Sequence, residues 1–205
     1  MADRPRRLHV LVEGQTEEIV VNQVISPYLA NYGWWTSHSL AKTKRPAGGS
    51  THKGGVTRWA KLELDLRLLL RDSSIDVLTT VLDYYAFPAD SPGMRTRPAG
   101  PPHDRVLHVE AALRTSVKDP RFLPNLVLHE LETWVFAAAE ELGSCGNDPK
   151  LAAILCRDVD AAGGSELVND GPLAIAELGI DDLRTRCPHF DAWLTRLISA
   201  PAEML

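Results

Sequence analysis

The sequence predicts an α/β fold with a mainly parallel central sheet, flanked by helices, and a helical C-terminal cap. Short apolar runs rich in β-branched residues, each long enough for one buried strand, alternate with stretches whose apolar residues recur at helical spacing. After residue 143 only helical patterns follow. Strands that alternate with helices favour parallel pairing, because each helix then serves as the crossover between two strands.

The first predicted strand and helix lie near the N-terminus. Residues 8–12 (LHVLV) end at Glu13 and Gly14, which is typical of a buried strand that feeds a tight turn. Thr16 is the expected N-cap of the following helix. Glu17 falls in the first turn of that helix, where a carboxylate stabilises the helix dipole.

Two more strands are predicted before residue 84. The first, at residues 34–40, is followed by a loop at 41–55 that is rich in glycine and lysine, and then by a helix at 57–71. The next strand, at 77–82, runs directly into Asp83. Its β-branched content indicates that it is the central strand.

The second half of the chain begins with a segment that is too rich in proline to form a helix or a strand. Residues 84–104 contain five prolines and predict an extended surface loop. A helix at 105–117, a strand at 125–128 and a helix at 130–142 are expected next. Further helical patterns lie at 150–161, 181–186 and 190–198.

Length and composition predict one compact domain. The chain has 205 residues, of which 44% are hydrophobic and 24% charged. Two separate units of half this size would each have a marginal core. We therefore expect a single domain over residues 1–205, with an α/β core at 1–142 and a helical extension at 143–205. The ordinary composition excludes a disordered or fibrous protein.

Charge, hydropathy and cysteine content predict a cytoplasmic protein. The apolar runs are too short to cross a membrane, and the N-terminus lacks the pattern of a signal peptide. The three cysteines show no Cys-x-x-Cys spacing, which argues against disulfides and a thiolate zinc site. The net charge of -5 argues against a protein that coats DNA nonspecifically, although it allows a local basic patch.

Carboxylates follow three of the predicted strands: Glu13, Asp83, and the pair Glu130 and Glu132. The carboxyl ends of parallel strands meet in one crevice, so these side chains are expected to converge. Clustered carboxylates repel one another unless a cation neutralises them, and hard oxygen ligands suit Mg²⁺ or Mn²⁺. The sequence therefore predicts one divalent-metal site that could hold a phosphodiester and activate water. The alternative, for any single acid, is a helix cap or an ion pair.

Other residues are auxiliary candidates. His129 could serve as a proton shuttle or ligand, although a lone histidine at a sheet edge is more often structural. Glu17 is a second auxiliary candidate. A local excess of cations makes Lys42, Lys53 and Arg58 candidates for phosphate binding. The chain has neither a Walker motif nor a Gly-x-Ser-x-Gly motif, which excludes ATP hydrolysis and serine-hydrolase chemistry of those types.

Four segments of the chain resemble a known family. They are VEGQTEE at 12–18, LDYYAFPADSPG at 82–93, LHELETWVFA at 128–137 and CPHFDAWLTRL at 187–197. The chain resembles, in this order of segments, the domain of unknown function family 4276, a bacterial group regarded as Toprim-like.

The resemblance implies a Toprim-like fold and roles for the acidic residues. In Toprim domains a glutamate after the first strand serves as general acid or base, and later acidic residues hold Mg²⁺. Carried over by motif, Glu13 takes the first role, Asp83 matches the leading aspartate of the second motif, and Glu130 or Glu132 completes the metal shell. The implied catalytic residues are thus Glu13, Asp83 and Glu130.

The resemblance also implies an activity and a partner. The expected function is a Mg²⁺- or Mn²⁺-dependent nuclease acting on DNA or RNA, which works with a separate ABC-like ATPase in defence against phage or mobile DNA. The usual Toprim second motif is Asp-x-Asp, whereas this chain reads Asp83-Tyr84-Tyr85. This departure motivates the alternative, a noncatalytic subunit that binds an ATPase or nucleic acid. A small-molecule phosphohydrolase is a third hypothesis, and a homo-oligomer is left open.

Overall fold

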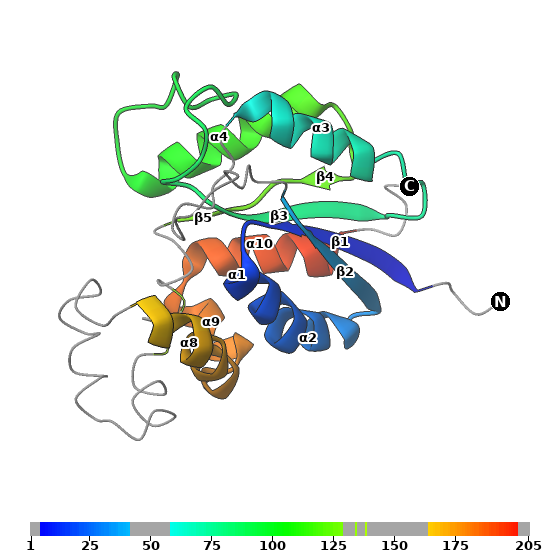
Figure 1. The fold of residues 1–205 in the computed structure, drawn as a ribbon, viewed down its shortest axis with the longest axis vertical. Helices are drawn as coiled ribbons and strands as arrows, with labels where there is room; N and C mark the ends of the chain where they lie inside the picture. The colour runs from blue at the N-terminus through cyan, green and yellow to red at the C-terminus, as the bar shows by residue number, and fades with distance from the viewer. Residues whose placement is uncertain (1–4, 42–57, 129–133, 135–137, 139–163, 201–205) are drawn as a thin grey trace, which may run out of the picture.

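The computed structural model describes residues 5–41, 58–128, 134, 138 and 164–200. Over this part of the chain a parallel sheet lies between two layers of helices (Figure 1). The strands are β1 (Arg6–Val12), β2 (Trp34–Leu40), β3 (Val77–Asp83), β4 (Phe122–Leu123) and β5 (Leu126–Val127). The predicted α/β fold class, a parallel sheet flanked by helices, is confirmed.

The strand order is β2-β1-β3-β4, and β5 also pairs with β3. Each of these pairings is parallel. β4 and β5 together run along β3 and are separated at Pro124, which has no amide hydrogen for a ladder. Within this gap the Thr80 hydroxyl accepts the amide of Asn125 at 3.0 Å and donates to its carbonyl at 2.7 Å. A side chain thus replaces the missing ladder bonds.

Two groups of helices cover the two faces of the sheet. On one face lie α3 (Trp59–Leu69) and α4 (Pro102–Val117), as Figure 1 shows. The other face carries α1 (Gln15–Val20), the π-helical segment η1 (Val21–Ile25), α2 (Ser26–Ala30) and α10 (Pro188–Ser199). Beside that second layer lie α8 (Gly164–Leu178) and α9 (Ile180–Arg186).

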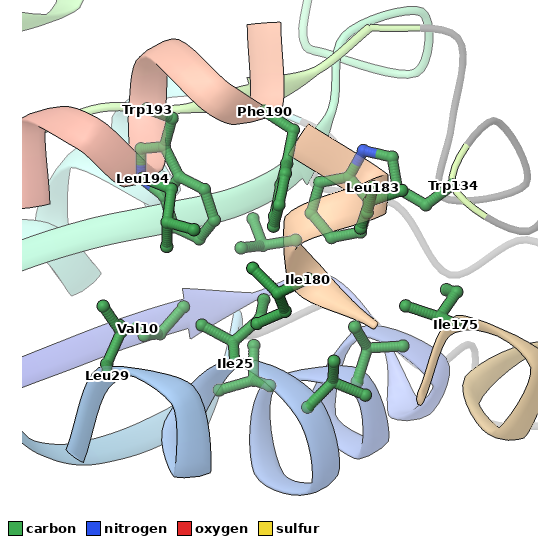
Figure 2. Close-up of a cluster of buried hydrophobic side chains, with 14 of the residues drawn as sticks. Val10, Ile25, Leu29, Trp134, Ile175, Ile180, Leu183, Phe190, Trp193 and Leu194 are labelled. Carbon is green, nitrogen blue, oxygen red and sulfur yellow. The ribbon is translucent and has the colours of Figure 1, made fainter. Parts of the chain in front are cut away.

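The C-terminal helix α10 packs directly on the sheet. Figure 2 shows Phe190, Trp193 and Leu194 directed towards side chains of β1, η1 and α2. The indole of Trp193 is fully buried and donates to the Thr79 hydroxyl on β3 at 2.9 Å. The indole of Trp34 on β2 donates to the carbonyl of Leu197 at 3.2 Å. The last described helix is therefore part of the main core.

The loop between β3 and α4 also contributes to a core. Tyr84, Phe87 and Met94 are buried beneath α3 and α4, so only part of the predicted extended surface loop is exposed. Gly93 has a φ of +83°, and a Cβ there would meet the Cα of Val109 on α4 at 3.0 Å. Only glycine lets the loop backbone lie this close to the helix.

One local prediction was wrong, and two elements were not predicted. Thr16 is not the N-cap of α1, because the helix begins after Gly14 and has no side-chain cap. Helix α8 was not predicted, since its Gly171-Pro172 pair is typical of a turn. Strand β4 is only two residues long, too short for any periodicity to reveal.

Other predictions fall outside the described residues, among them the helices at 130–142 and 150–161 and nearly all of the loop at 41–55. No helix in the described part of the chain combines the length and the hydropathy that crossing a membrane requires.

Candidate functional site

The ends of β1 and β3 bring Glu13 and Asp83 together. The two strands are parallel neighbours, with Val12 opposite Val81. The Glu13 amide donates to the carbonyl of Val81 at 3.2 Å, and the Asp83 amide donates to Oε2 of Glu13 at 2.9 Å. Two residues 70 positions apart thus meet at the carboxyl rim of the sheet, where parallel α/β folds bind ligands.

The Asp83 carboxylate is held by its own turn. Oδ1 accepts the amide of Tyr85 and Oδ2 accepts the amide of Ala86, both at 2.9 Å. This is the aspartate turn that commonly follows a strand, and it is a structural role in its own right. Each carboxylate oxygen has two lone pairs, so one accepted amide leaves each oxygen of Asp83 a further acceptor position. The turn thereby holds the carboxylate in place, and both of its oxygens can still accept a further hydrogen bond or bind a cation.

The third strand end lies beside the second. Val127 on β5 is opposite Asp83, and the Tyr84 amide donates to the Val127 carbonyl at 3.1 Å. The chain therefore leaves β5 at the same rim. Glu130 and Glu132, as well as His129, lie outside the described residues, so their convergence on the site stays a prediction.

Glu17 lies close to the turn after β1. Its Oε2 would be 3.0 Å from a Cβ placed on Gly14, the residue that follows Glu13. Glu18, next in the same helical turn, forms an ion pair with Nε2 of His38 on β2 at 2.9 Å. Sequence reasoning did not single out His38, because a lone histidine within a strand gives no local sign of a partner 20 residues away.

Of the three candidate phosphate-binding residues, the structure describes Arg58. Arg58 is exposed at the N-terminal end of α3. Lys42 and Lys53 lie outside the described residues, so a phosphate-facing surface stays a prediction.

Hard oxygen donors suit Mg²⁺ or Mn²⁺, and the rim supplies two carboxylates of this kind. Among the described residues, no group of three or more histidine, cysteine, aspartate or glutamate side chains is placed to hold a metal ion. The donor set that the structure describes therefore fits part of a divalent-metal shell, and the predicted remainder is Glu130 and Glu132.

Comparison with protein families adds an independent finding. The family described as "Domain of unknown function (DUF4276)" matches residues 12–157. The chain belongs to the DUF4276 family. The matched part of this DUF4276 protein includes Glu13, Asp83, Glu130 and Glu132.

Comparison with solved structures finds the C-terminal region of the Burkholderia pseudomallei OLD protein. The TM-score is 0.39 at 16% sequence identity, and the match covers 94% of the DUF4276 chain and 97% of the other. A likeness at this level supports no argument about activity, so the fold class rests on the sheet topology described above. Among proteins with curated descriptions, no relative of the DUF4276 chain is found.

Proposed function

We propose that this protein is a Toprim-like, Mg²⁺- or Mn²⁺-dependent nuclease that cleaves phosphodiester bonds in DNA or RNA. Glu13, Asp83 and Glu130 are the proposed catalytic residues, and Glu132 is a further metal ligand. The observation that carries the proposal is the hydrogen bond from the Asp83 amide to Oε2 of Glu13, at 2.9 Å, across two neighbouring strand ends. It holds two carboxylate-bearing residues at the rim where such folds bind ligands.

A bound divalent ion would supply Lewis-acid stabilisation of phosphate charge and a water of lowered pKa. The residues of the protein itself contribute by positioning the two carboxylates. The Asp83 carboxylate accepts the amides of Tyr85 and Ala86, and the Glu13 carboxylate accepts the amide of Asp83. A general base must be held within reach of the proton that it abstracts, and an anchored Glu13 carboxylate meets that requirement for a water or hydroxyl at the rim.

The proposal extends to a partner. Resemblance to the Toprim nucleases supports a separate ABC-like ATPase subunit, a cytoplasmic location and a role in defence against phage or mobile DNA. The specific support is the four-segment pattern in the sequence, together with membership of the DUF4276 family.

One observation favours a second function, that of a noncatalytic adaptor for an ATPase or nucleic acid. Tyr85 stands where the usual Toprim motif has its second aspartate, and its side chain is 55% exposed. A site that lacks one carboxylate binds a divalent cation more weakly. The affinity for the metal ion therefore distinguishes the nuclease from the adaptor.

Calorimetric titration of Mn²⁺ tests the proposal. The variants are Glu13→Gln and, as a matched control, Glu63→Gln on α3, where Glu63 pairs with Arg67. Glutamine at position 13 keeps an oxygen that can accept the Asp83 amide, and it replaces the other carboxylate oxygen and the charge by a neutral NH₂ group. We expect wild type and the control to bind Mn²⁺ alike, and Glu13→Gln to bind at least tenfold more weakly.

The titration is repeated with a phosphorothioate oligonucleotide present, because a substrate phosphate can complete a metal shell. Folded wild type that binds no Mn²⁺ at millimolar concentration in either titration contradicts the metal site and leaves the adaptor. Mn²⁺ binding that depends on Glu13 is followed by cleavage assays on single-stranded and duplex DNA and RNA. The nuclease proposal then requires that wild type cleave at least one of these substrates and that Glu13→Gln abolish the cleavage.

A further inference from the structure

A pocket of about 360 Å³ opens at the carboxyl end of β5. Its volume falls in the range of small-molecule sites, about 300 to 1,000 Å³. Its walls come from the end of β5, the first turn of α4, the junction between α9 and α10, and Trp134. The lining residues are His103, Val127, Leu128, Trp134, Arg186, Cys187, Pro188, His189 and Phe190.

The pocket adjoins the candidate metal site through one strand. Val127, part of the pocket wall, lies opposite Asp83 in the pairing of β3 with β5. A ligand in the pocket would therefore lie at the same rim of the sheet as the Glu13–Asp83 pair. This is the crevice that parallel α/β folds use for binding.

The floor of the pocket is apolar and aromatic. Val127, Trp134 and Phe190 are at most 4% exposed. The rings of Trp134 and Phe190 meet edge to face, with centroids 4.8 Å apart and planes at 65° (Figure 2). An apolar floor of this kind favours an apolar, flat group, and every nucleobase has such a face.

The upper part of the pocket carries cationic and hydrogen-bonding groups. The side chains of His103 and Arg186 are exposed, so they stand at the opening. The rings of His103 and His189 are nearly perpendicular, at 86°, with centroids 5.6 Å apart. Nε2 of His189 lies 3.1 Å from Oε1 of the buried Glu110. A guanidinium and an imidazole at the opening can donate hydrogen bonds to an anionic group such as a phosphate.

Thiol chemistry is excluded as the use of this pocket. Burial raises the pKa of the Cys187 thiol to about 11, against a smaller opposing influence of Arg186. The thiol therefore stays protonated at neutral pH, and the thiolate is the nucleophilic form. Cys187 contributes an apolar wall.

We propose that this pocket binds a terminal nucleotide of a single-stranded nucleic acid, with the base on the aromatic floor and the phosphate at Arg186 and His103. The inference rests on the proposed nuclease function, for which it names the substrate class. A volume of about 360 Å³ accommodates one nucleotide, whereas a duplex end would require the base to leave its pair.

Calorimetric binding of AMP without metal tests the pocket. Ribose 5-phosphate is the comparison that keeps the phosphate and lacks the base. The variants are His103→Ala and Arg186→Gln, both at exposed positions. Matched controls are His108→Ala on the same helix, where His108 contacts Thr96, and Arg67→Gln on α3. We expect AMP to bind at least tenfold more tightly than ribose 5-phosphate, each pocket variant to weaken AMP at least tenfold, and the controls to match wild type.

The outcomes separate this inference from the proposed function. Wild type that binds none of AMP, CMP, GMP and UMP overturns the pocket proposal, whatever the Mn²⁺ titration shows. Equal affinity for AMP and ribose 5-phosphate also overturns the pocket proposal, because the base then contributes nothing to the affinity. If AMP binding requires Arg186 and His103 in protein that binds no Mn²⁺, the result supports the nucleotide pocket and contradicts the proposed nuclease activity.

Discussion

At the scale of single residues, the two acidic groups at the rim differ in how tightly their geometry restricts substitution. Asp83 accepts two amides through two different oxygens, and the amide group of an asparagine cannot do so. Oε2 of Glu13 accepts the Asp83 amide, and the side-chain oxygen of a glutamine can retain that hydrogen bond. A loss of function on replacing Asp83 therefore mixes a structural and a chemical effect. Glu13 is the cleaner position at which to test the chemistry.

His9 on β1 shows a different residue-scale effect, a response to pH. Its Nδ1 lies 2.9 Å from Oγ of Ser37 and its Nε2 lies 2.9 Å from Oγ of Ser39, both on β2. Burial lowers the pKa of His9 below 6.5, and the nearby His38 lowers it further, although Asp72 opposes this. The folded protein thus binds the His9 proton more weakly than the unfolded chain does.

This difference predicts a loss of stability in acid. Well above pH 6.5 the imidazole is neutral in both states, so its titration does not change the free energy of unfolding. As the pH falls from 6.5 towards the lower folded pKa, the unfolded chain takes up the proton first and the free energy of unfolding decreases. Urea unfolding of wild type and His9→Gln from pH 7.5 to 5 checks this. The variant should show a weaker dependence on pH, and equal slopes would contradict the assignment to His9.

At the scale of elements, one arginine joins three segments. The guanidinium of Arg121, just before β4, donates to the carbonyls of Leu70 and Asp72 at the end of α3 and of Ile75 before β3. It also forms an ion pair with Asp119 at 2.8 Å, which holds the pKa of that carboxyl below its ordinary value. The planar guanidinium can serve several acceptors at once, and an ammonium group serves fewer in fixed directions.

We expect Arg121→Lys to destabilise the protein by about 2 kcal/mol, because carbonyls at the α3–β3 junction lose their donor. Urea unfolding measures the change. Arg67→Lys is the control, since Arg67 forms an exposed pair within one helix and such pairs contribute little. A loss no greater than that of the control would show that the carbonyls find other partners.

At the scale of the whole molecule, α10 ties the C-terminal part of the described chain to the sheet. Trp193 bonds to Thr79 on β3, and the carbonyl of Leu197 accepts the indole of Trp34 on β2. These bonds span separations of 114 and 163 residues. The folding of the sheet and the docking of α10 are therefore expected to be one cooperative event.

A double-mutant cycle tests this coupling. Trp193→Phe should cost about 2 kcal/mol, since it removes buried volume and leaves the Thr79 hydroxyl without its donor. In a Thr79→Val background the same change should cost about 1 kcal/mol less, because no hydroxyl is left behind. Thermal or urea unfolding measures each corner of the cycle. Additive costs would show that the bond between Trp193 and Thr79 contributes nothing.

The strands β1 and β3 were predictable because they are apolar runs that lie largely buried inside the sheet. β2, the outer strand in the described order, is more exposed. β2 lies at the predicted residues 34–40, and β3 extends the predicted strand by one residue, to Asp83. Apolar β-branched runs of this length have few other stable environments. The sequence could not reveal β4 or α8. The first is too short for periodicity, and the second contains a Gly-Pro pair that local rules assign to a turn.

The proximity of Glu13 and Asp83 could be predicted from the sequence, whereas the convergence of Glu130 and Glu132 and the role of the site stay predictions. Glu13 and Asp83 meet because parallel pairing aligns the ends of neighbouring strands. The pocket at the end of β5 could not be foreseen, since His103, Val127, Trp134 and Arg186 come from segments that have no sequence pattern in common.

The late position of α10 has a consequence for synthesis on the ribosome. Trp34 and Leu197 are 163 residues apart, so about 8 to 33 s separate their synthesis at ordinary elongation rates of about 5 to 20 residues per second. Throughout that interval the apolar face of β1 and β2 that α10 covers lacks its helix. The nascent chain therefore exposes apolar residues before it can fold, and exposed apolar surface of this kind makes incomplete chains prone to aggregation.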